Sequence, residues 1–241
     1  MRLVWRLVWV FALCVFSIGG CNEVITPTTA PLRLSIRGHT GGAEYQQPLE
    51  GAQVCEGDTD DNCDFSDANG EVTIEVPFDQ EIFYTVEKEG YDSQLIPQVI
   101  PESGRTVVVQ LSTVKVVADV YERAMSPYPR LGTGEVYIVV SPGDFAGVTF
   151  DLEGAWGTPF YQVGRGDPIT YRLDLDATTS EGRGGFLEVP PGSTVKVVFG
   201  GTAATCFPNG SGWPGDDEHS VRIPVRAGYE NRLLVSCIRS P

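Results

Sequence analysis

The chain has 241 residues, of which 41% are hydrophobic, enough to build a packed core in one large domain or two small ones. It carries 17 Lys and Arg residues against 32 Asp and Glu residues, and its net charge of −15 argues against a nucleic-acid-binding surface, because phosphates would be repelled. The 28 Gly and 17 Pro residues favour many short elements joined by turns over long helices.

Residues 1–20 have the pattern of a signal peptide. Arg2 and Arg6 precede an almost wholly apolar stretch, which is shorter than the roughly 20 apolar residues that span a bilayer. The sequence IGGC at 18–21 resembles the bacterial lipobox, in which an aliphatic residue and two small residues precede a lipidated cysteine. The resemblance implies cleavage before Cys21, which then carries the fatty acyl (palmitate-type) membrane anchor. An ordinary signal peptide with a coincidental cysteine is the alternative.

The segment 21–30 contains Thr and Pro without periodicity, and we expect it to be a lipidated tether between membrane and folded part. Loss of the leader removes two arginines and leaves a net charge of −17. Asn22, rather than an aspartate, follows the cysteine, which by the usual sorting rule favours the outer membrane of a two-membrane cell. The expected location is therefore the cell envelope.

Alternation of apolar and polar residues with a period of two recurs after the leader. The alternating segments, each bounded by Gly, Pro, Asn or Asp, are 32–37, 72–76, 106–111, 114–120, 171–176, 195–199, 221–225 and 232–238. We find no helical stripe of ten or more residues after Cys21. One apolar face per strand is typical of half-buried antiparallel strands, so the sequence predicts an all-β protein built from antiparallel sandwiches.

A weak internal repeat divides the chain. Segments 69–77 and 184–190 both combine a Gly turn with a short strand that ends in Glu-Val-Pro, and each half closes on a further Gly turn and strand. We therefore predict two β-sandwich domains, 31–112 and 113–241, the second a divergent copy of the first.

Four cysteines remain once the leader and the lipidated position are set aside. An even number in an oxidising compartment predicts two disulfides, and proximity in sequence favours Cys55–Cys63 and Cys206–Cys237 among the three pairings. A zinc site is the rival use, but the chain has no CxxC pair and only two histidines.

Three segments of the first half carry a family resemblance. PLEGAQV at 48–54, SDANGEV at 66–72 and EGYD at 89–92 resemble the carboxypeptidase regulatory-like domain, with Ser66 in place of the usual threonine. The resemblance covers about residues 32–112 and implies a transthyretin-like sandwich. Such domains are generally non-catalytic modules for spacing, adhesion or binding of sugars, peptides or proteins at cell surfaces.

Two acidic clusters are candidate metal sites. The loop from Asp58 to Asp67 holds enough carboxylate and amide oxygens for Ca²⁺, but its spacing is not that of an EF-hand, and a solvated loop fixed by the first disulfide is the preferred interpretation. The second cluster, 216–219 in the loop Pro208 to Ser220, joins three acids to a histidine, but adjacent loop residues point in different directions. We predict no metal and no cofactor.

Three aromatic residues on Gly- and Pro-rich segments are candidate ligand contacts, namely Trp156, Tyr161 and Trp213, although such residues more often close the end of a sandwich. We find no G-x-S-x-G nucleophile elbow, P-loop or dinucleotide-binding motif, and predict no catalytic residues. The sequence thus favours a non-catalytic envelope lipoprotein with two transthyretin-like or immunoglobulin-like β-sandwiches, which serves as a binding or structural module. Its expected partners are the membrane, through the lipid anchor, and a protein or glycan ligand. A carbohydrate-binding surface protein and a hydrolase of envelope polymers are the alternatives.

Overall fold

The computed structural model describes residues 28–41, 45–59, 61–141, 145–164, 168–192 and 194–239. The predicted signal peptide and Cys21 lie outside these residues. The first strand begins at Thr29, so the last two residues of the predicted tether belong to the fold. No helix in the described ranges is long and apolar enough to cross a bilayer.

Strands dominate the fold, so the all-β prediction is confirmed. The strands of the first half are β1 (Thr29–His39), β2 (Tyr45–Pro48), β3 (Gln53–Glu56), β4 (Cys63–Phe65), β5 (Glu71–Pro77), β6 (Glu81–Glu87), β7 (Gln94–Val99) and β8 (Arg105–Ser112). One helix, α1 (Val114–Arg123), follows. The strands of the second half are β9 (Gly134–Ser141), β10 (Val148–Glu153), β11 (Thr158–Val163), β12 (Thr170–Arg172), β13 (Arg183–Val189), β14 (Thr194–Gly201), β15 (Ala203–Ser211), β16 (Trp213–Pro214), β17 (Ser220–Pro224) and β18 (Glu230–Arg239).

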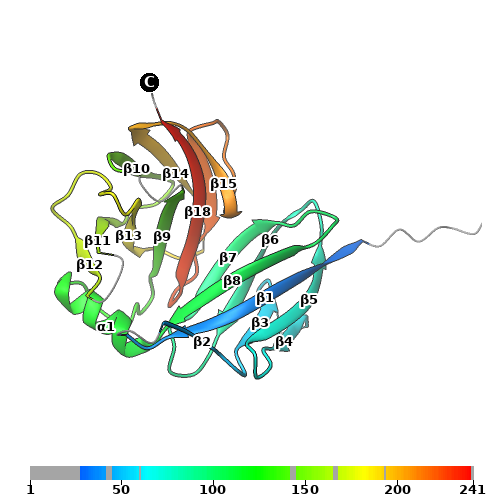
Figure 1. Cartoon of the computed structure of the whole chain (residues 1–241). Coiled ribbons are helices and arrows are strands. Elements are labelled where there is room, and N and C mark those ends of the chain that lie inside the picture. Colours follow the sequence, from blue (N-terminus) through cyan, green and yellow to red (C-terminus); the bar gives the residue numbers. More distant parts are fainter. Residues whose placement is uncertain are drawn as a thin grey trace, which may run out of the picture.

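The strands form three sheets within the described residues (Figure 1). One contains β2, β1, β5 and β8, a second contains β10, β14, β17 and β16, and the third runs from β12 through β11, β13, β9, β18, β7, β6 and β3 to β4, with β15 beside β18. Most neighbours are antiparallel, as predicted. Three pairs are parallel instead, namely β1 with β8, β9 with β18, and β7 with β18.

Two large apolar cores lie between the sheets. The first draws its buried residues from 30–111 and the second from 136–237. The largest sheet nevertheless continues through both halves, because Glu230 and Asn231 of β18 pair with Gln94 and Leu95 of β7. The division into domains at residue 112 therefore stays a prediction, although the change of core falls in the same region.

The segment 114–120, predicted as a strand, lies in α1, and this prediction was wrong. The Thr113 hydroxyl caps the first turn, as threonine commonly does at a helix start. Val117, Val120 and Tyr121 recur at helical spacing and face the protein. The β-branched valines suggested a strand, whereas the cap and the spacing of the larger side chains indicated a helix.

Two other boundaries differ from the predictions. The alternating segment 171–176 is a strand only as far as Arg172, after which the chain bends. The predicted loop from Pro208 to Ser220 contains the end of β15 and all of β16. β12 and β16 are short strands of three and two residues, and each pairs with a strand close to it in sequence, β11 and β17 respectively.

The predicted turn before β5 is present. The Asp67 Oδ1 atom accepts hydrogen bonds from the backbone N–H groups of Asn69, at 2.8 Å, and Glu71, at 2.9 Å. These two backbone donors lower the pKa of Asp67. Gly70 has a φ of 77°, and a Cβ atom there would lie 2.3 Å from the Ile36 carbonyl oxygen, so the turn requires glycine.

Both predicted disulfides are confirmed. Cys55–Cys63 joins β3 to β4, and Cys206–Cys237 joins β15 to β18, so each half has one bridge between paired strands.

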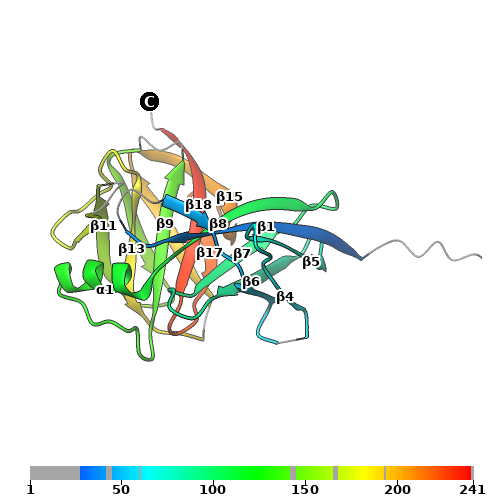
Figure 2. The same cartoon turned by 60° about the horizontal axis from the view of Figure 1, so that its bottom comes forward.

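Helix α1 covers the second face of the largest sheet. Figure 2 shows it beside β11, β13 and β9, and Tyr121 packs there with Phe160, Tyr171 and Leu187. β9 is therefore covered on both faces, by the second core on one side and by α1 on the other. The side that faces α1 combines this smaller apolar cluster with polar side chains such as Glu135.

Candidate functional site

Alternation along β9 and β18 separates an apolar face from a polar one. Val136 and Ile138 of β9 point into the second core, so Glu135 and Tyr137 point the other way, toward α1. On β18, Arg232 lies opposite Tyr137 in the parallel register, just as Glu230 lies opposite Glu135. The sheet thereby gathers four charged or polar side chains on one face.

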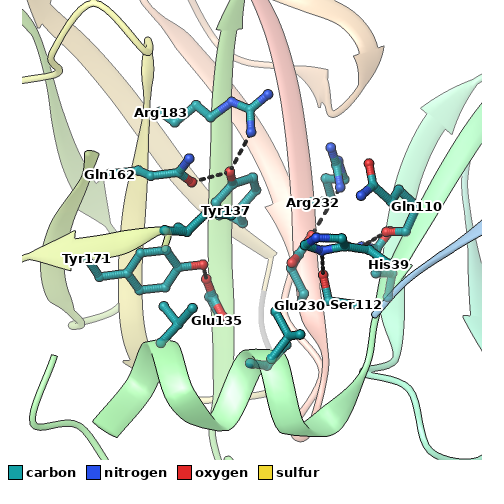
Figure 3. Close-up of a pocket in the computed structure, with 15 residues that line it drawn as sticks. His39, Gln110, Ser112, Glu135, Tyr137, Gln162, Tyr171, Arg183, Glu230 and Arg232 are labelled. Atoms are coloured by element: carbon teal, nitrogen blue, oxygen red, sulfur yellow. Dashed lines mark hydrogen bonds and ion pairs between the residues drawn. The ribbon is translucent and has the colours of Figure 1, made fainter. Parts of the chain in front are cut away.

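A cavity of about 300 Å³ lies over this polar face. Its other walls come from α1 and from the ends of β1 and β8, which contribute His39, Gln110 and Ser112 (Figure 3). The volume lies at the lower end of the range for small-molecule sites. The walls join both halves of the chain.

Glu135 and Tyr171, which line the cavity, belong to a buried ionic network centred on Arg130, in the segment between α1 and β9. Its guanidinium donates from Nη1 and Nη2 to Asp92 Oδ1 and Oδ2 at 2.8 and 2.6 Å, from Nη2 to Glu135 Oε2 at 3.0 Å, and from Nε to the Tyr121 hydroxyl at 2.8 Å. Burial lowers the pKa of Arg130, but Glu135, Tyr121 and Asp92 outweigh this and raise it well above its ordinary value. Arg130 therefore stays charged and ties the first half to the second.

Tyrosines complete the network. The hydroxyl of Tyr121 donates to Glu135 Oε2 at 2.6 Å, that of Tyr171 donates to Glu135 Oε1 at 3.0 Å, and that of Tyr128 donates to Asp92 Oδ1 at 3.1 Å. Burial, together with the nearby carboxylates, raises the pKa of all three tyrosines. Both oxygens of Glu135 are thus occupied, and the residue is 1% exposed, so its role is structural.

The opposite part of the cavity is less completely paired. Figure 3 shows Tyr137 in the middle, with Arg183 and Gln162 on one side and Arg232 on the other. The Tyr137 hydroxyl donates to Gln162 Oε1 at 2.6 Å and accepts from Arg183 Nη1 at 3.4 Å. Arg183 has no carboxylate partner among the residues that the structure describes. Arg232 contacts Glu230 at 3.4 Å and lies over the Tyr137 ring, with its Cζ atom 5.7 Å from the ring centroid. Two guanidinium groups therefore retain unused donors.

Glu230 is the carboxyl group of the cavity that Arg130 does not contact. Burial raises its pKa to about 7; Glu135 and Asp92 act in the same direction, whereas Arg232 and Arg130 oppose it. Gln94 Nε2 donates to Glu230 Oε1 at 3.1 Å and to the Gln110 carbonyl at 2.9 Å. Near neutral pH the cavity thus contains a carboxyl group that is partly protonated.

This arrangement is suited to binding. Glu135 and Glu230 both line the cavity, but the oxygens of Glu135 are held by Arg130 and two tyrosines, so it is poorly placed to act with Glu230 as a hydrolytic pair. Across the described parts of the chain, no three His, Cys, Asp or Glu side chains are grouped so that they could hold a metal ion.

The predicted ligand-contact aromatics are not brought together. Trp156 is 64% exposed, whereas Tyr161 is buried with its ring stacked on Phe150. Trp213 is also buried, and its Nε1 donates to the Ile82 carbonyl at 2.9 Å, so it joins β16 to β6. Neither buried ring offers the open face that a stacked sugar needs.

Side chains of the first acidic cluster already form contacts with other residues of the protein. Asp58 forms an ion pair with Arg226 at 3.5 Å, and Asn62 donates to the Glu56 carboxylate at 2.7 Å. Asp67 caps its own turn, as described above. Asp60 lies outside the described residues, and the interpretation of a solvated loop fixed by Cys55–Cys63 stays a prediction.

The second acidic cluster lies on the surface. Lys196 contacts Glu153 at 2.7 Å and Asp216 at 3.5 Å, and the His219 side chain is half exposed with its Nε2 3.8 Å from Glu218. The hydrogen bonds from the His219 backbone and the Ser220 hydroxyl lower the pKa of Asp217. These contacts shape a turn outside the cavity.

None of the charged residues that line the cavity was predicted from the sequence to be a site residue. The available signal was a polar residue at alternate positions in a strand that is otherwise apolar, as in GEVYIVV from Gly134 and ENRLLV from Glu230. Such a pattern indicates a strand covered on both faces, with one face polar.

Comparison with known proteins gives no family. No family model matches the chain, and no curated protein matches it. Among solved structures, shaft pilin SpaA from Lactobacillus rhamnosus GG is 11% identical over 88% of this chain and 98% of its own, with a TM-score of 0.27. The Bacillus anthracis TIE protein is 15% identical over 87% of this chain and 34% of its own, with a TM-score of 0.28. The minor pilin GBS52 of Streptococcus agalactiae is 13% identical over 87% of this chain and 97% of its own, with a TM-score of 0.24.

Likenesses this low carry no argument about function, and the all-β fold rests on the strands themselves. The resemblance of residues 32–112 to the carboxypeptidase regulatory-like domain therefore stays a prediction.

Proposed function

We propose that this chain is a non-catalytic lipoprotein of the bacterial cell envelope, anchored in the outer membrane through Cys21, which binds a small polar ligand in the cavity beneath α1. The observation that carries the proposal is the cavity itself, where the incompletely paired Arg183 and Arg232 lie beside a fully paired network.

The network around Arg130 supports binding because it fixes one wall of the cavity in advance. Arg130, Tyr121 and Tyr171 all hold the side chain of Glu135, so little conformational freedom is left to lose when a ligand enters. A site on strands that are braced in this way is better ordered than one on mobile loops.

The envelope location is supported by the leader and the cysteines. The pattern of residues 1–20, with the IGGC sequence that ends at Cys21, is that of an exported and lipidated chain. The two disulfides suit an oxidising compartment, since cytosolic thiols are kept reduced.

The anchor is tested by labelling cells that express the full chain with a radioactive fatty acid. We expect the protein to take up the label, to lose it in Cys21→Ala and to keep it in Cys14→Ala, the matched control within the leader. Label that persists in Cys21→Ala would overturn the anchor.

Binding is tested on the full chain, purified in detergent, by thermal unfolding with neutral sugars, amino acids, aliphatic monocarboxylates and inorganic phosphate. A ligand at 100 times its Kd stabilises the folded state by about 2.7 kcal/mol. Val117→Trp fills the cavity from α1, whereas Val114→Trp adds the same bulk at a residue outside the cavity that is 42% exposed. We expect at least one ligand class to stabilise the wild type and the control but not Val117→Trp, and no stabilisation by any class would count against the proposal.

The carbohydrate alternative depends mainly on Trp156, since Tyr161 and Trp213 are buried. Stabilisation by a neutral sugar that disappears in Trp156→Ala and persists in Val117→Trp would favour it over the cavity.

A further inference from the structure

We infer that the cavity binds a small organic monocarboxylate, with the carboxylate between Arg183 and Arg232 and the hydrocarbon part against α1. This inference rests on the proposed function and names the class of ligand.

The placement of the two arginines carries the inference. They extend from β13 and β18, the two neighbours of β9, and lie on either side of Tyr137 (Figure 3). Both side chains are partly buried, and 31% of the Arg232 side chain is exposed. A planar guanidinium matches a planar carboxylate and can donate two parallel hydrogen bonds to it.

Few donors of these arginines are used by the protein. Arg183 makes one hydrogen bond, of 3.4 Å, to the Tyr137 hydroxyl, and Arg232 contacts Glu230 at 3.4 Å. Each guanidinium has five N–H donors, so most remain for a ligand. Arg130 differs, because Asp92, Glu135, Tyr121 and a backbone carbonyl occupy its donors.

The charges of the residues around the cavity favour a ligand that carries a single negative charge. Arg130 carries one positive charge and pairs with two carboxylates, those of Asp92 and Glu135, so one negative charge is left over in this network. Arg183 and Arg232 then face this surplus charge and Glu230, whose ionisation is disfavoured by burial. A monoanion fits this balance, whereas a dianion such as phosphate would place two further negative charges beside Glu135 and Glu230.

The other side of the cavity is apolar. Val116, Val117 and Val120 of α1 and the neighbouring Ile169 line it, opposite the charged strands. A ligand that is charged at one end and apolar at the other meets both surfaces in a cavity of about 300 Å³. Each CH₂ group buried there should tighten binding about fourfold.

The test is equilibrium dialysis of the full chain at pH 6, below the pKa of Glu230, against acetate, butanoate and hexanoate, with butan-1-ol as the neutral probe and inorganic sulfate as the dianion. The same detergent is used throughout, so that partition of a probe into micelles is equal for all variants. We expect affinity to rise from acetate to hexanoate and to be at least about tenfold weaker for butan-1-ol than for butanoate, since a hydrogen bond to a charged group is lost.

Substitution of each arginine tests whether it contacts the bound carboxylate. Arg183→Gln and Arg232→Gln should each weaken butanoate binding about tenfold or more. Arg172→Gln, which removes a surface arginine paired with Asp174 outside the cavity, should leave binding unchanged. Near-ultraviolet circular dichroism identifies any variant that has lost its fold.

The outcomes separate the inference from the proposed function. If butan-1-ol or sulfate binds as tightly as butanoate, or if both arginine variants bind normally, the inference is wrong. If a neutral sugar or an amino acid binds instead and Val117→Trp blocks it, the inference fails while the proposed function stands. If no probe binds, both fail.

Discussion

Two clusters of charged residues share one face of the largest sheet, and they differ in how completely their hydrogen bonds are made. Around Arg130, each charged side chain meets a partner of opposite charge or a tyrosine hydroxyl. Around Tyr137, by contrast, Arg183 and Arg232 have one or two long contacts each. A buried donor or acceptor without a hydrogen bond costs free energy. The first cluster, whose hydrogen bonds are complete, therefore stabilises the fold, whereas the second has donors that could bind another molecule.

The difference also shows how location decides the role of a charge. Arg130 and Glu135 are almost inaccessible to solvent, whereas Arg183 and Arg232 retain partial exposure at the cavity. The same type of side chain therefore holds the two halves together in one place and remains available in the other. Three of the four substitutions below test this contrast, and the fourth tests a separate hydrogen bond between β16 and β6.

The largest effect is expected for Arg130→Met. Removal of the guanidinium leaves Asp92 and Glu135 buried without compensation, and breaking a buried pair in this way costs about 3–5 kcal/mol. Urea unfolding with the disulfides intact measures the loss. Arg172→Met, at an exposed ion pair, is the control and should show no measurable change, so equal stabilities for the two variants would refute the structural role of Arg130.

Glu230→Gln should alter the pH dependence of stability. The pKa of Glu230 in the folded state, about 7, lies above its ordinary value of 4.5, so the contribution of Glu230 to stability is fully present below pH 4.5 and is lost as the pH rises from there through 7. The variant cannot ionise here, and above pH 7 it should be more stable than the wild type by on the order of 3 kcal/mol. Unfolding free energies measured from pH 4 to pH 8 test this, and parallel profiles would contradict it.

A smaller effect is expected for Trp213→Phe. The substitution keeps an aromatic ring at the junction but removes the hydrogen bond from Nε1 to the Ile82 carbonyl, which should cost about 1 kcal/mol. Trp156→Phe, at a residue that is 64% exposed, is the matched control and should stay within about 0.5 kcal/mol of the wild type. Identical losses in the two variants would show that the link between β16 and β6 adds nothing.

The smallest effect on stability is expected for Arg183→Gln. Its one hydrogen bond is long, so the free energy of unfolding should stay within about 0.5 kcal/mol of the wild type. A loss as large as that of Arg130→Met would mean that Arg183 stabilises the fold after all, and the contrast between the two clusters would disappear.

Much of the fold could be predicted from local pattern. The alternation in 72–76, 195–199 and 221–225 corresponds to β5, β14 and β17, and the proximity of cysteines gave both disulfides. These features depend on residues that are close in sequence or on a period of two, which a single chain displays directly. The helix α1 was missed because its valines favour strands, although its cap and spacing were present.

The cavity could not be predicted in the same way. Its charged and polar residues come from strands far apart in the chain, from His39 to Arg232, and only the register between β9 and β18 brings Tyr137 and Arg232 together. The candidate aromatics were chosen for their Gly- and Pro-rich surroundings, which do not reveal burial. Pairing between distant strands is the information that the sequence alone does not display.

The length of β1 has a consequence for where a ligand comes from. This strand runs for 11 residues, from Thr29 to His39 at the rim of the cavity, and along it the chain advances roughly 33 Å (Figure 1). With Cys21 lipidated as proposed, the anchor and the cavity lie at opposite ends of this strand. The ligand would then enter from the aqueous phase, at the end of β1 that is remote from the anchor.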